Sequence, residues 1–245
     1  MRMRKLCACA RIGWATASRF PKTAAVHRRF TRLFHGTGYL GAMAGPNSPP
    51  IHVAAPLPRA FYARDPREVA PELLNKILAR ADGRAGRIVE VEAYCGAEDP
   101  AAHSFRGPTP RTASMFGRAG HLYVYFTYGM HWGTNAVCGE VGEGVGVLLR
   151  AIEPLGDVAA MRAARRNPAK DRDIGSGPGK LSQALGITGD FDGADLVTGD
   201  AGFQILDDGT PPPRTPVTAT RVGISRAREH PWRWYVPGNP HVSRK

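Results

Sequence analysis

The sequence lacks a long apolar run and lacks any metal-binding pattern of cysteine or histidine. A membrane-spanning helix needs about 18 or more consecutive apolar residues, and no stretch of the chain approaches that length. The four cysteines include no CxxC pair and no zinc spacing, and the eight histidines include no HExxH motif. We therefore expect no membrane segment, no metal, no cofactor and a compartment that keeps the cysteines reduced.

Acidic residues are absent from the first 64 positions. That segment carries 11 of the 33 Lys and Arg residues, which leaves 22 basic against 21 acidic residues in the rest of the chain. The net charge of +12 therefore belongs almost entirely to the N-terminal segment. A nucleic-acid-binding face elsewhere must come from the placement of charges rather than from bulk charge. Candidates for such a face are Arg106, Arg111, Arg118, Lys180, Arg221 and Arg226.

Residues 1–50 are rich in arginine and show no apolar periodicity, so we expect a basic, disordered N-terminal extension. Three origins fit this composition: an arm that tracks along DNA, an organelle transit peptide, or translation from a start codon upstream of the true one. Met43 opens a more ordinary N-terminal sequence. Residues 51–245 have the length of one globular domain and would be cramped as two.

The apolar pattern predicts more strands than helices. Strands are expected near residues 87–94, 122–127, 131–137, 145–153, 203–206, 217–224 and 234–236. Helices are expected to start at Asp65-Pro66, with an apolar stripe that reaches Leu78, then at Pro154, and again after Lys180. Without βαβ alternation, this order favours a single α+β domain built on a curved, mostly antiparallel sheet flanked by helices.

The most informative stretch is Arg87–Tyr94, with the sequence RIVEVEAY. Its alternation places three apolar residues on one face of a strand and Glu90, Glu92 and Tyr94 on the other. A carboxylate and an aromatic ring that project together from a rigid strand can hold a flat ligand and activate a water against it. A half-exposed strand with a polar outer face explains the pattern equally well. Spacing alone does not say which glutamate would act.

Glu92-Ala-Tyr94 and the following block Glu98–Ser104 (EDPAAHS) resemble the 3-methyladenine DNA glycosylases of the alkyladenine type. More blocks match in the same order, across residues 65–243: Thr109–Arg111, Met115-Phe116, Leu122–Met130, Asn135, Val147–Pro154, Gly175–Leu181, Gln183–Leu185 and Tyr235–Gly238. Several short, dissimilar blocks in fixed order are far more specific than one motif. The resemblance implies a fold like the C-terminal domain of formyltransferases, with a protruding β-hairpin.

For chemistry, the resemblance assigns the central role to Glu92. Cleavage of an N-glycosidic bond passes through an oxocarbenium-like sugar, and one carboxylate can deprotonate the attacking water and stabilise the positive charge. Arg150 matches the family arginine that helps to hold that water. A structural ion pair, for example with Glu153, is the alternative for Arg150.

The resemblance also implies an aromatic cage formed by Tyr94, His103 and Tyr125. Alkylated purines are cationic, so electron-rich rings attract them by stacking and cation–π interaction, and the charge makes the base a better leaving group. For Tyr125 the structural alternative is that Tyr123 and Tyr125 serve only in cross-strand packing, and for His103 it is an ordinary structural role in a loop. Asn135 matches a gate residue that crowds the amino group of guanine, and a buried cross-strand hydrogen bond is its alternative.

Tyr128 lies at the expected hairpin tip beside Gly129, where a large ring has no core to join. In the family this tyrosine is a wedge that enters the space left by a flipped nucleotide. A surface aromatic without function is the alternative.

A glycine-rich segment, Gly175–Lys180, resembles a phosphate loop. A P-loop would need Gly at position 174 and Ser or Thr at 181, where this sequence has Ile174 and Leu181, so a nucleoside triphosphatase is rejected. Backbone amides at this helix start could still hold a DNA phosphate, with Lys180 and Arg111 as further DNA contacts.

The sequence thus predicts a monomeric, monofunctional DNA glycosylase that flips alkylated or deaminated purines (3-methyladenine, 7-methylguanine, hypoxanthine, ethenoadenine) out of double-stranded DNA. Beyond Asp65 the lysines are Lys76, Lys170, Lys180 and Lys245. We expect none of them in the pocket, and therefore no Schiff-base lyase step.

Two other functions remain open at this point. One is a non-enzymatic nucleic-acid-binding module on the same fold, which the intact Glu92, Arg150 and cage disfavour. The other is a glycosidase for free nucleosides, which the hairpin wedge disfavours. A bacterial enzyme of this kind is expected in the cytoplasm with the nucleoid, whereas a genuine targeting segment would direct it to the mitochondrion or nucleus.

Overall fold

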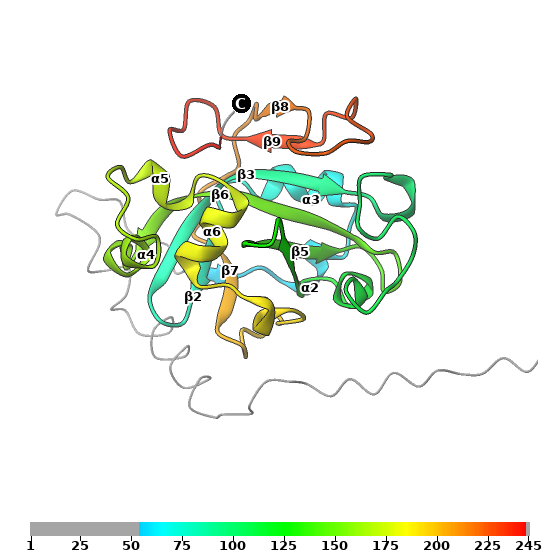
Figure 1. Cartoon of the computed structure of the whole chain (residues 1–245), viewed down its shortest axis with the longest axis horizontal. Helices are drawn as coiled ribbons and strands as arrows, with labels where there is room; N and C mark the ends of the chain where they lie inside the picture. Colours follow the sequence, from blue (N-terminus) through cyan, green and yellow to red (C-terminus); the bar gives the residue numbers. More distant parts are fainter. Residues whose placement is uncertain (1–53, 244–245) are drawn as a thin grey trace, which may run out of the picture.

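A computed structural model describes residues 54–243, which form one curled antiparallel sheet with short helices packed around it (Figure 1). The expected boundary near residue 50 lies outside the described residues. The strands are β1 (Ala55–Pro56), β2 (Ile77–Arg80), β3 (Arg84–Tyr94), β4 (Leu122–Thr127), β5 (His131–Cys138), β6 (Val145–Gly156), β7 (Phe203–Asp207), β8 (Val217–Ala219) and β9 (Arg233–Tyr235). The α-helices are α2 (Arg59–Tyr62), α3 (Pro66–Leu73), α4 (Val158–Ala164), α5 (Arg172–Gly175) and α6 (Pro178–Leu185).

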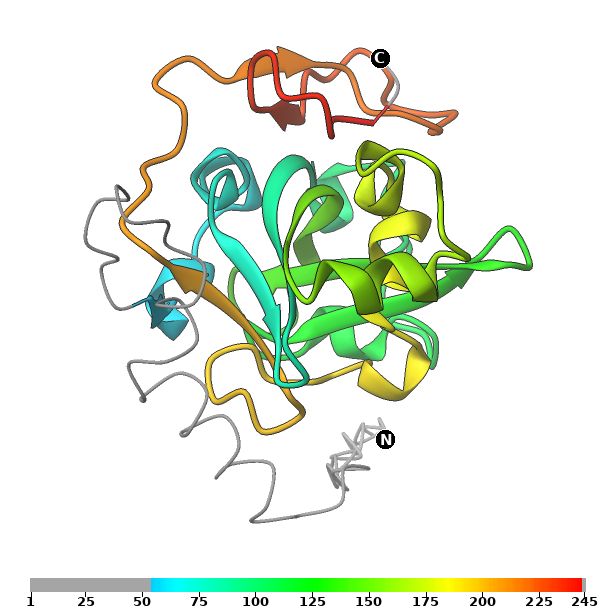
Figure 2. The same cartoon turned by 90° about the vertical axis from the view of Figure 1, so that its left-hand side faces the viewer.

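Every strand pairing in the described sheet is antiparallel, in the order β1-β7-β2-β3-β6-β5-β4. The small strand β9 also pairs with β3, and β8 pairs with β9. Figures 1 and 2 show β8 and β9 lying across one end of the molecule, above the main sheet. This architecture confirms the predicted α+β class. It also places the C-terminal segment directly beside β3.

The first long helix, α3, is capped as its sequence predicts but ends earlier. Asp65 accepts a hydrogen bond from the backbone N–H of Arg67 at 2.7 Å, and proline at the first helical position is already set to the helical φ. The helix ends at Leu73, Leu74 is already extended, and Asn75 turns the chain with φ +68°. The apolar residues at 77 and 78 therefore belong to strand β2, because pairing with β3 and β7 outweighs their helical spacing.

The expected helix start at Pro154 is wrong. That proline lies inside β6, which pairs with β3 as far as Arg84–Gly156. Pairing of β6 with β5 ends at Leu148 and a single bridge joins Ala151 to Ser176, so at Pro154 no second strand pairs with β6 and proline is tolerated. Helix α4 begins at Val158 instead, with Asp157 accepting from Ala160 N at 2.9 Å. Helix α6 likewise starts at Pro178, before the expected position.

The core lies between the sheet and the helices. Helix α3 packs on β3, while α6 packs on β5 and β6 and contacts α4 and α5. The two longest strands, β3 and β6, are buried over most of their length. Long buried strands with partners on both sides are rigid supports, so their side chains are held in fixed directions. Within residues 54–243 no helix has the length and apolar character to span a membrane.

Candidate active site

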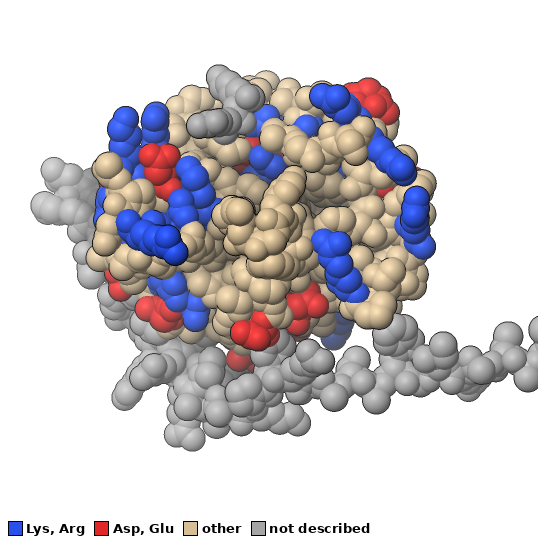
Figure 3. All heavy atoms as spheres, in the orientation of Figure 1, with Lys and Arg blue, Asp and Glu red and all other residues tan. Residues whose placement is uncertain are grey.

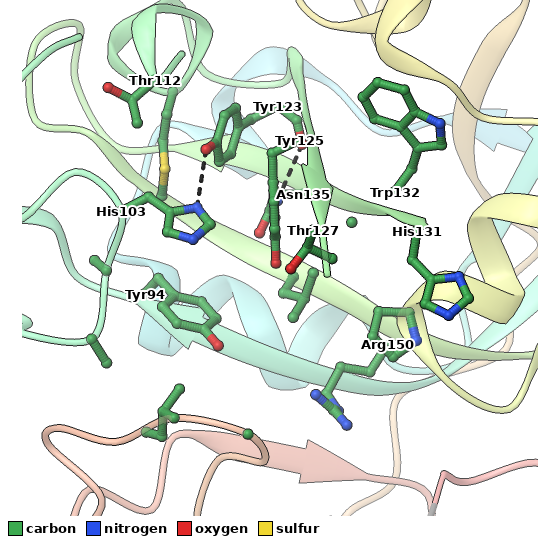
Figure 4. Close-up of a pocket in the computed structure, with 18 of the residues that line it drawn as sticks. Tyr94, His103, Thr112, Tyr123, Tyr125, Thr127, His131, Trp132, Asn135 and Arg150 are labelled. Atoms are coloured by element: carbon green, nitrogen blue, oxygen red, sulfur yellow. Dashed lines mark hydrogen bonds between the residues drawn. The ribbon is translucent and has the colours of Figure 1, made fainter. Parts of the chain in front are cut away.

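A cavity of about 830 Å³ opens among β4, β5, β6, the 100–112 loop, the start of α6 and the C-terminal segment. Eight of the nine site residues predicted from the sequence line it: Tyr94, His103, Arg111, Tyr125, Tyr128, Asn135, Arg150 and Lys180. Figure 4 shows the aromatic side chains from β3, β4 and the 100–112 loop around one space, with Arg150 below it. The ninth residue, Glu92, lies directly behind the cavity wall.

Glu92 is completely buried, at 0% exposure, and three donors surround its carboxylate. Oε2 accepts from the Tyr94 hydroxyl at 3.0 Å, and Oε1 accepts from the backbone N–H of Val222 at 2.7 Å. Arg150 Nη1 lies 3.2 Å from Oε1. Burial raises the pKa of Glu92 above its ordinary value, although Arg150 and the two hydrogen bonds oppose that shift. A carboxylate in this state accepts a proton more readily than one exposed to water.

Arg150 projects from β6 toward β3, which explains its partners. Its Nε donates to Glu90 at 2.8 Å, and its Nη1 faces Glu92. Arg150 therefore does form buried ion pairs, but with Glu90 and Glu92 rather than with Glu153, which instead accepts from Asn239 Nδ2 at 3.0 Å. Burial lowers the pKa of the Arg150 guanidinium, but the two carboxylates outweigh burial and raise it, so the side chain stays charged.

Three aromatic rings form a corner of the cavity. The ring of His103 stands perpendicular to that of Tyr125, with centroids 4.5 Å apart, and Tyr125 stacks on Tyr123 at 5.4 Å. The Tyr123 hydroxyl is 3.0 Å from His103 Nδ1, so the imidazole is held by a hydrogen bond as well as by packing (Figure 4). Burial and the nearby Arg111 lower the pKa of His103, which favours the neutral ring. Tyr94 faces this corner from β3.

The flat position of Tyr125 depends on Gly133, its partner across the β4–β5 pair. A Cβ atom added at Gly133 would lie 2.6 Å from Tyr125 Cζ, which is closer than real contacts allow. The glycine therefore lets the ring lie across β5 toward the cavity. Tyr125 therefore packs across the hairpin on Gly133 and also lines the cavity.

Asn135 forms the buried cross-strand hydrogen bond and also lines the cavity. Its Nδ2 donates to the backbone oxygen of Tyr123 at 3.1 Å, across the hairpin strands, and the side chain lines the cavity with only 3% of the residue exposed. The cross-strand bond holds the amide in one rotamer. A side chain held in this way presents a fixed steric boundary to anything that enters the cavity.

Tyr128 lies at the tip of the β4–β5 hairpin and is 77% exposed. Its φ of +52° lies in the left-handed region, which bulky residues rarely adopt, and Gly129 follows with φ +66°. The turn closes through Met130 N, which donates to Thr127 O at 3.2 Å. A strained backbone that presents an unpacked aromatic ring beside a cavity is a recurrent feature of functional loops.

The basic residues around the cavity differ in how they are held. Lys180, at the start of α6, reaches Asp173 at 3.3 Å and Ser176 Oγ at 3.4 Å. It lines the cavity, which corrects the expectation that no lysine would lie there. The guanidinium of Arg111 lies 5.7 Å from the centroid of the Tyr125 ring. Figure 3 shows Lys and Arg side chains on both sides of a largely uncharged central surface.

Arg221 is not a surface charge, contrary to the expectation of a DNA-facing role. Its guanidinium is fully buried and pairs with both oxygens of Asp99, at 2.5 and 2.8 Å. It also donates to Ala93 O at 3.0 Å and lies 4.7 Å from the centroid of the Tyr94 ring. Arg221 therefore joins the C-terminal segment to β3, next to Val222. Of the other candidates, Arg106 and Arg226 line the cavity and Arg118 does not.

Three contributors to this site received no role in it from the sequence. Tyr123 could have been found, because it precedes Tyr125 on the same strand face and aromatic pairs at that spacing stack. Glu90 was considered, but its link to Arg150 depends on how β3 and β6 are paired. Val222 acts through its backbone N–H, 130 positions away from Glu92 in the chain, and side-chain identity carries no signal for such a contact. Across residues 54–243 no group of three or more His, Cys, Asp and Glu residues is placed to hold a metal.

Comparison with known proteins agrees with this geometry. The methylpurine-DNA glycosylase family model matches residues 60–240. A Burkholderia lata protein named "Putative 3-methyladenine DNA glycosylase" is 61% identical over 189 residues, which cover 77% of this chain and 91% of that protein. Proteins of the same name from Koribacter versatilis and Methanoculleus marisnigri are each 48% identical, covering 78% and 77% of this chain and 94% and 99% of their own lengths. This chain belongs to the methylpurine-DNA glycosylase family and is a DNA glycosylase.

Proposed function

We propose that this protein hydrolyses the N-glycosidic bond of alkylated and deaminated purines in double-stranded DNA, with Glu92 as the general base. The observation that carries the proposal is the position of one buried carboxylate of raised pKa directly behind an aromatic cavity. A base that is both shielded from water and next to a ring-lined cavity suits an attack on the sugar of a purine held among those rings.

In the proposed reaction a water oxygen forms a bond to the anomeric carbon while the bond from that carbon to the purine breaks. The electron pair of the broken bond leaves with the base, and Glu92 takes a proton from the water. The developing positive charge on the sugar is stabilised by the carboxylate. Arg150, at 3.2 Å from Glu92, keeps the carboxylate in the ionised form that the step requires.

The cage favours cationic purines for two reasons. The faces of Tyr94 and Tyr125 attract positive charge, and burial raises the pKa of both hydroxyls, so both stay neutral phenols. The lowered pKa of His103 also matters, because a neutral imidazole does not repel a methylated, positively charged purine. The labile glycosidic bond of such a purine then needs less activation than that of a neutral one. Neutral lesions such as hypoxanthine would depend more strongly on Glu92.

Access to a base in duplex DNA requires the nucleotide to leave the helix. Tyr128, exposed at the hairpin tip on a backbone of positive φ, fits the role of a wedge that occupies the vacated space. Arg111 and Lys180, which both line the cavity, fit phosphate contacts that orient the strand.

We further propose that the enzyme is monofunctional, although Lys180 lines the cavity. A lyase step needs an unprotonated amine that can attack the sugar. The Lys180 amine instead contacts Asp173 at 3.3 Å and Ser176 at 3.4 Å, so it would have to leave these partners to attack the sugar. Borohydride trapping of a covalent complex on lesion DNA would contradict this part of the proposal.

The decisive test is Glu92→Gln, with Glu98→Gln as a control in the exposed loop that follows β3. Single-turnover release of 3-methyladenine and hypoxanthine would be measured from one duplex sequence and from the free nucleosides, with lesion-DNA affinity measured separately. We expect Glu92→Gln to keep binding and to lose hypoxanthine release by about 100-fold or more. The control should match the wild type. Equal release by Glu92→Gln and wild type would exclude Glu92 as the base, and preference for free nucleosides would exclude DNA as the substrate.

A further inference from the structure

Glu90, two residues before Glu92, is fully buried and accepts hydrogen bonds from three segments of the chain. Its Oε1 accepts from Arg150 Nε at 2.8 Å, from Arg233 Nε at 2.7 Å and from Ser243 Oγ at 2.9 Å. Its Oε2 accepts from the backbone N–H of Ser243 at 2.7 Å. These donors come from β6, from β9 and from the last described residue of the chain. One carboxylate therefore ties the C-terminal end to the centre of the sheet.

The planar guanidinium of Arg150 is held on all three nitrogens. Its Nε faces Glu90, its Nη1 lies 3.2 Å from Glu92, and its Nη2 donates to Ser243 Oγ at 3.3 Å. A planar group that is bound at each nitrogen has no freedom to rotate. The direction in which Nη1 faces Glu92 is therefore determined by Glu90 and Ser243 together.

We propose that Glu90 and Ser243 are positioning residues, which hold Arg150 against Glu92 and thereby set how readily Glu92 is ionised. This inference rests on the proposed function of Glu92. Neither Glu90 nor Ser243 lines the cavity, so each acts through Arg150 rather than on a substrate. Ser243, the last described residue, would thus support the active site without lining the cavity.

The charge of Glu90 and its proposed positioning role have opposite effects on the pKa of Glu92, which allows a clear test. The charged and titratable groups that face Glu92 are Glu90 and Tyr94 on its own strand, Arg150 on β6, Tyr125 on β4, and Arg221 in the C-terminal segment. The negative charge of Glu90 raises the pKa of Glu92, and the positive charge of Arg150 lowers it. Removal of Glu90 therefore lowers the pKa of Glu92 if Arg150 stays in place. It raises that pKa if Arg150 moves away.

The experiment measures single-turnover release of hypoxanthine from duplex DNA as a function of pH, with lesion-DNA affinity and melting temperature for each variant. Ser243→Ala should slow release about 3- to 10-fold, as expected for one lost hydrogen bond. Its acid limb, where Glu92 becomes protonated, should move to higher pH at unchanged affinity. Ser243→Thr keeps the hydroxyl and should restore the rate. Ser182→Ala, which removes a buried hydroxyl on α6 that bonds to Thr134 at 2.9 Å, should leave rate and pH profile unchanged.

Glu90 variants separate the charge from the acceptor. Glu90→Gln keeps an oxygen for Arg150 but loses the charge, so the rate should stay within about threefold and the acid limb should move to lower pH. Glu90→Ala removes the acceptor. Its rate should fall by up to about 100-fold, as for other misplaced catalytic groups, with the acid limb at higher pH. The Ser243 variants leave the buried carboxylate and both arginines in place, so they decide the question even where Glu90→Ala does not fold.

Failure of the proposed function and failure of the positioning role give different results. A wild-type protein that releases no purine from lesion DNA would overturn the proposed function, and the positioning role would fall with it. An active wild type whose Ser243→Ala variant has an unchanged rate and acid limb would overturn the positioning role alone. A lower melting temperature with an unmoved acid limb would likewise assign Ser243 a structural role only.

Discussion

The hydroxyl of Tyr94 donates a hydrogen bond to Oε2 of Glu92 at 3.0 Å. The two residues are next-but-one neighbours on β3, so their side chains leave the same face of the strand. This bond joins a ring of the cavity wall to the carboxylate behind it. Recognition of a purine and ionisation of the proposed base are therefore physically connected.

This contact predicts the behaviour of Tyr94→Phe. The hydrogen bond lowers the pKa of Glu92, so its loss raises that pKa further above the ordinary value. Because the base must be ionised, the acid limb of excision should move to higher pH, with a rate loss of about 3- to 10-fold below neutral pH. Lesion affinity should remain, since the phenylalanine ring still stacks. A limb that moves to lower pH would contradict the role of the bond.

Asn135→Ser should relax discrimination against guanine. The wild-type amide is held in one rotamer by its bond to Tyr123 O, whereas serine is too short to make that bond or to fill the same space. Slow release of normal guanine should appear, while release of 3-methyladenine should survive within about tenfold. Gas-chromatographic or radiolabel assays of bases released from undamaged DNA would detect it. Equal rejection of guanine by variant and wild type would rule out the gate.

Tyr128→Ala should impair the release of neutral, well-paired lesions more than that of cationic ones. The wedge matters most where bond cleavage is slow compared with return of the base to the stack. Hypoxanthine release should fall about tenfold or more, and 7-methylguanine release should fall less, because the cage also holds the cation. Single-turnover rates on one duplex sequence, with 2-aminopurine fluorescence beside the site, would measure both excision and unstacking. Unchanged fluorescence and rates would return Tyr128 to an ordinary surface residue.

Asp99→Ala should destabilise the protein strongly. It leaves the fully buried Arg221 without its carboxylate partner, and removal of one member of a buried ion pair costs about 3–5 kcal/mol. The double variant Asp99→Ala/Arg221→Met removes the orphaned charge and should recover part of that loss. Urea denaturation monitored by tryptophan fluorescence would give both values. A single variant as stable as the double one would show that the pair is not energetically coupled.

Strand faces and turns were predictable from the sequence because they obey local rules. Alternation along β3 placed Glu92 beside Tyr94, and the hydrogen bond between them agrees with that placement. The hairpin turn at Tyr128 followed from a glycine between two apolar strands, and the matching blocks of residues indicated the family. Failures occurred where distant pairing outweighed local pattern. Pro154 stayed in a strand because β3 pairs alongside it.

The sequence thus indicated eight residues that line the cavity, and the tertiary structure decided the electrostatic state of the site. Burial raises the pKa of Glu92 only in the folded chain, where Arg150 and the backbone N–H of Val222 also reach the carboxylate and oppose that shift. Arg150 is directed by Glu90 and Ser243, which lie 60 and 93 positions away in the chain. No local rule links positions so far apart, because burial and charge proximity exist only once the sheet has curled and the C-terminal segment has closed beside β3.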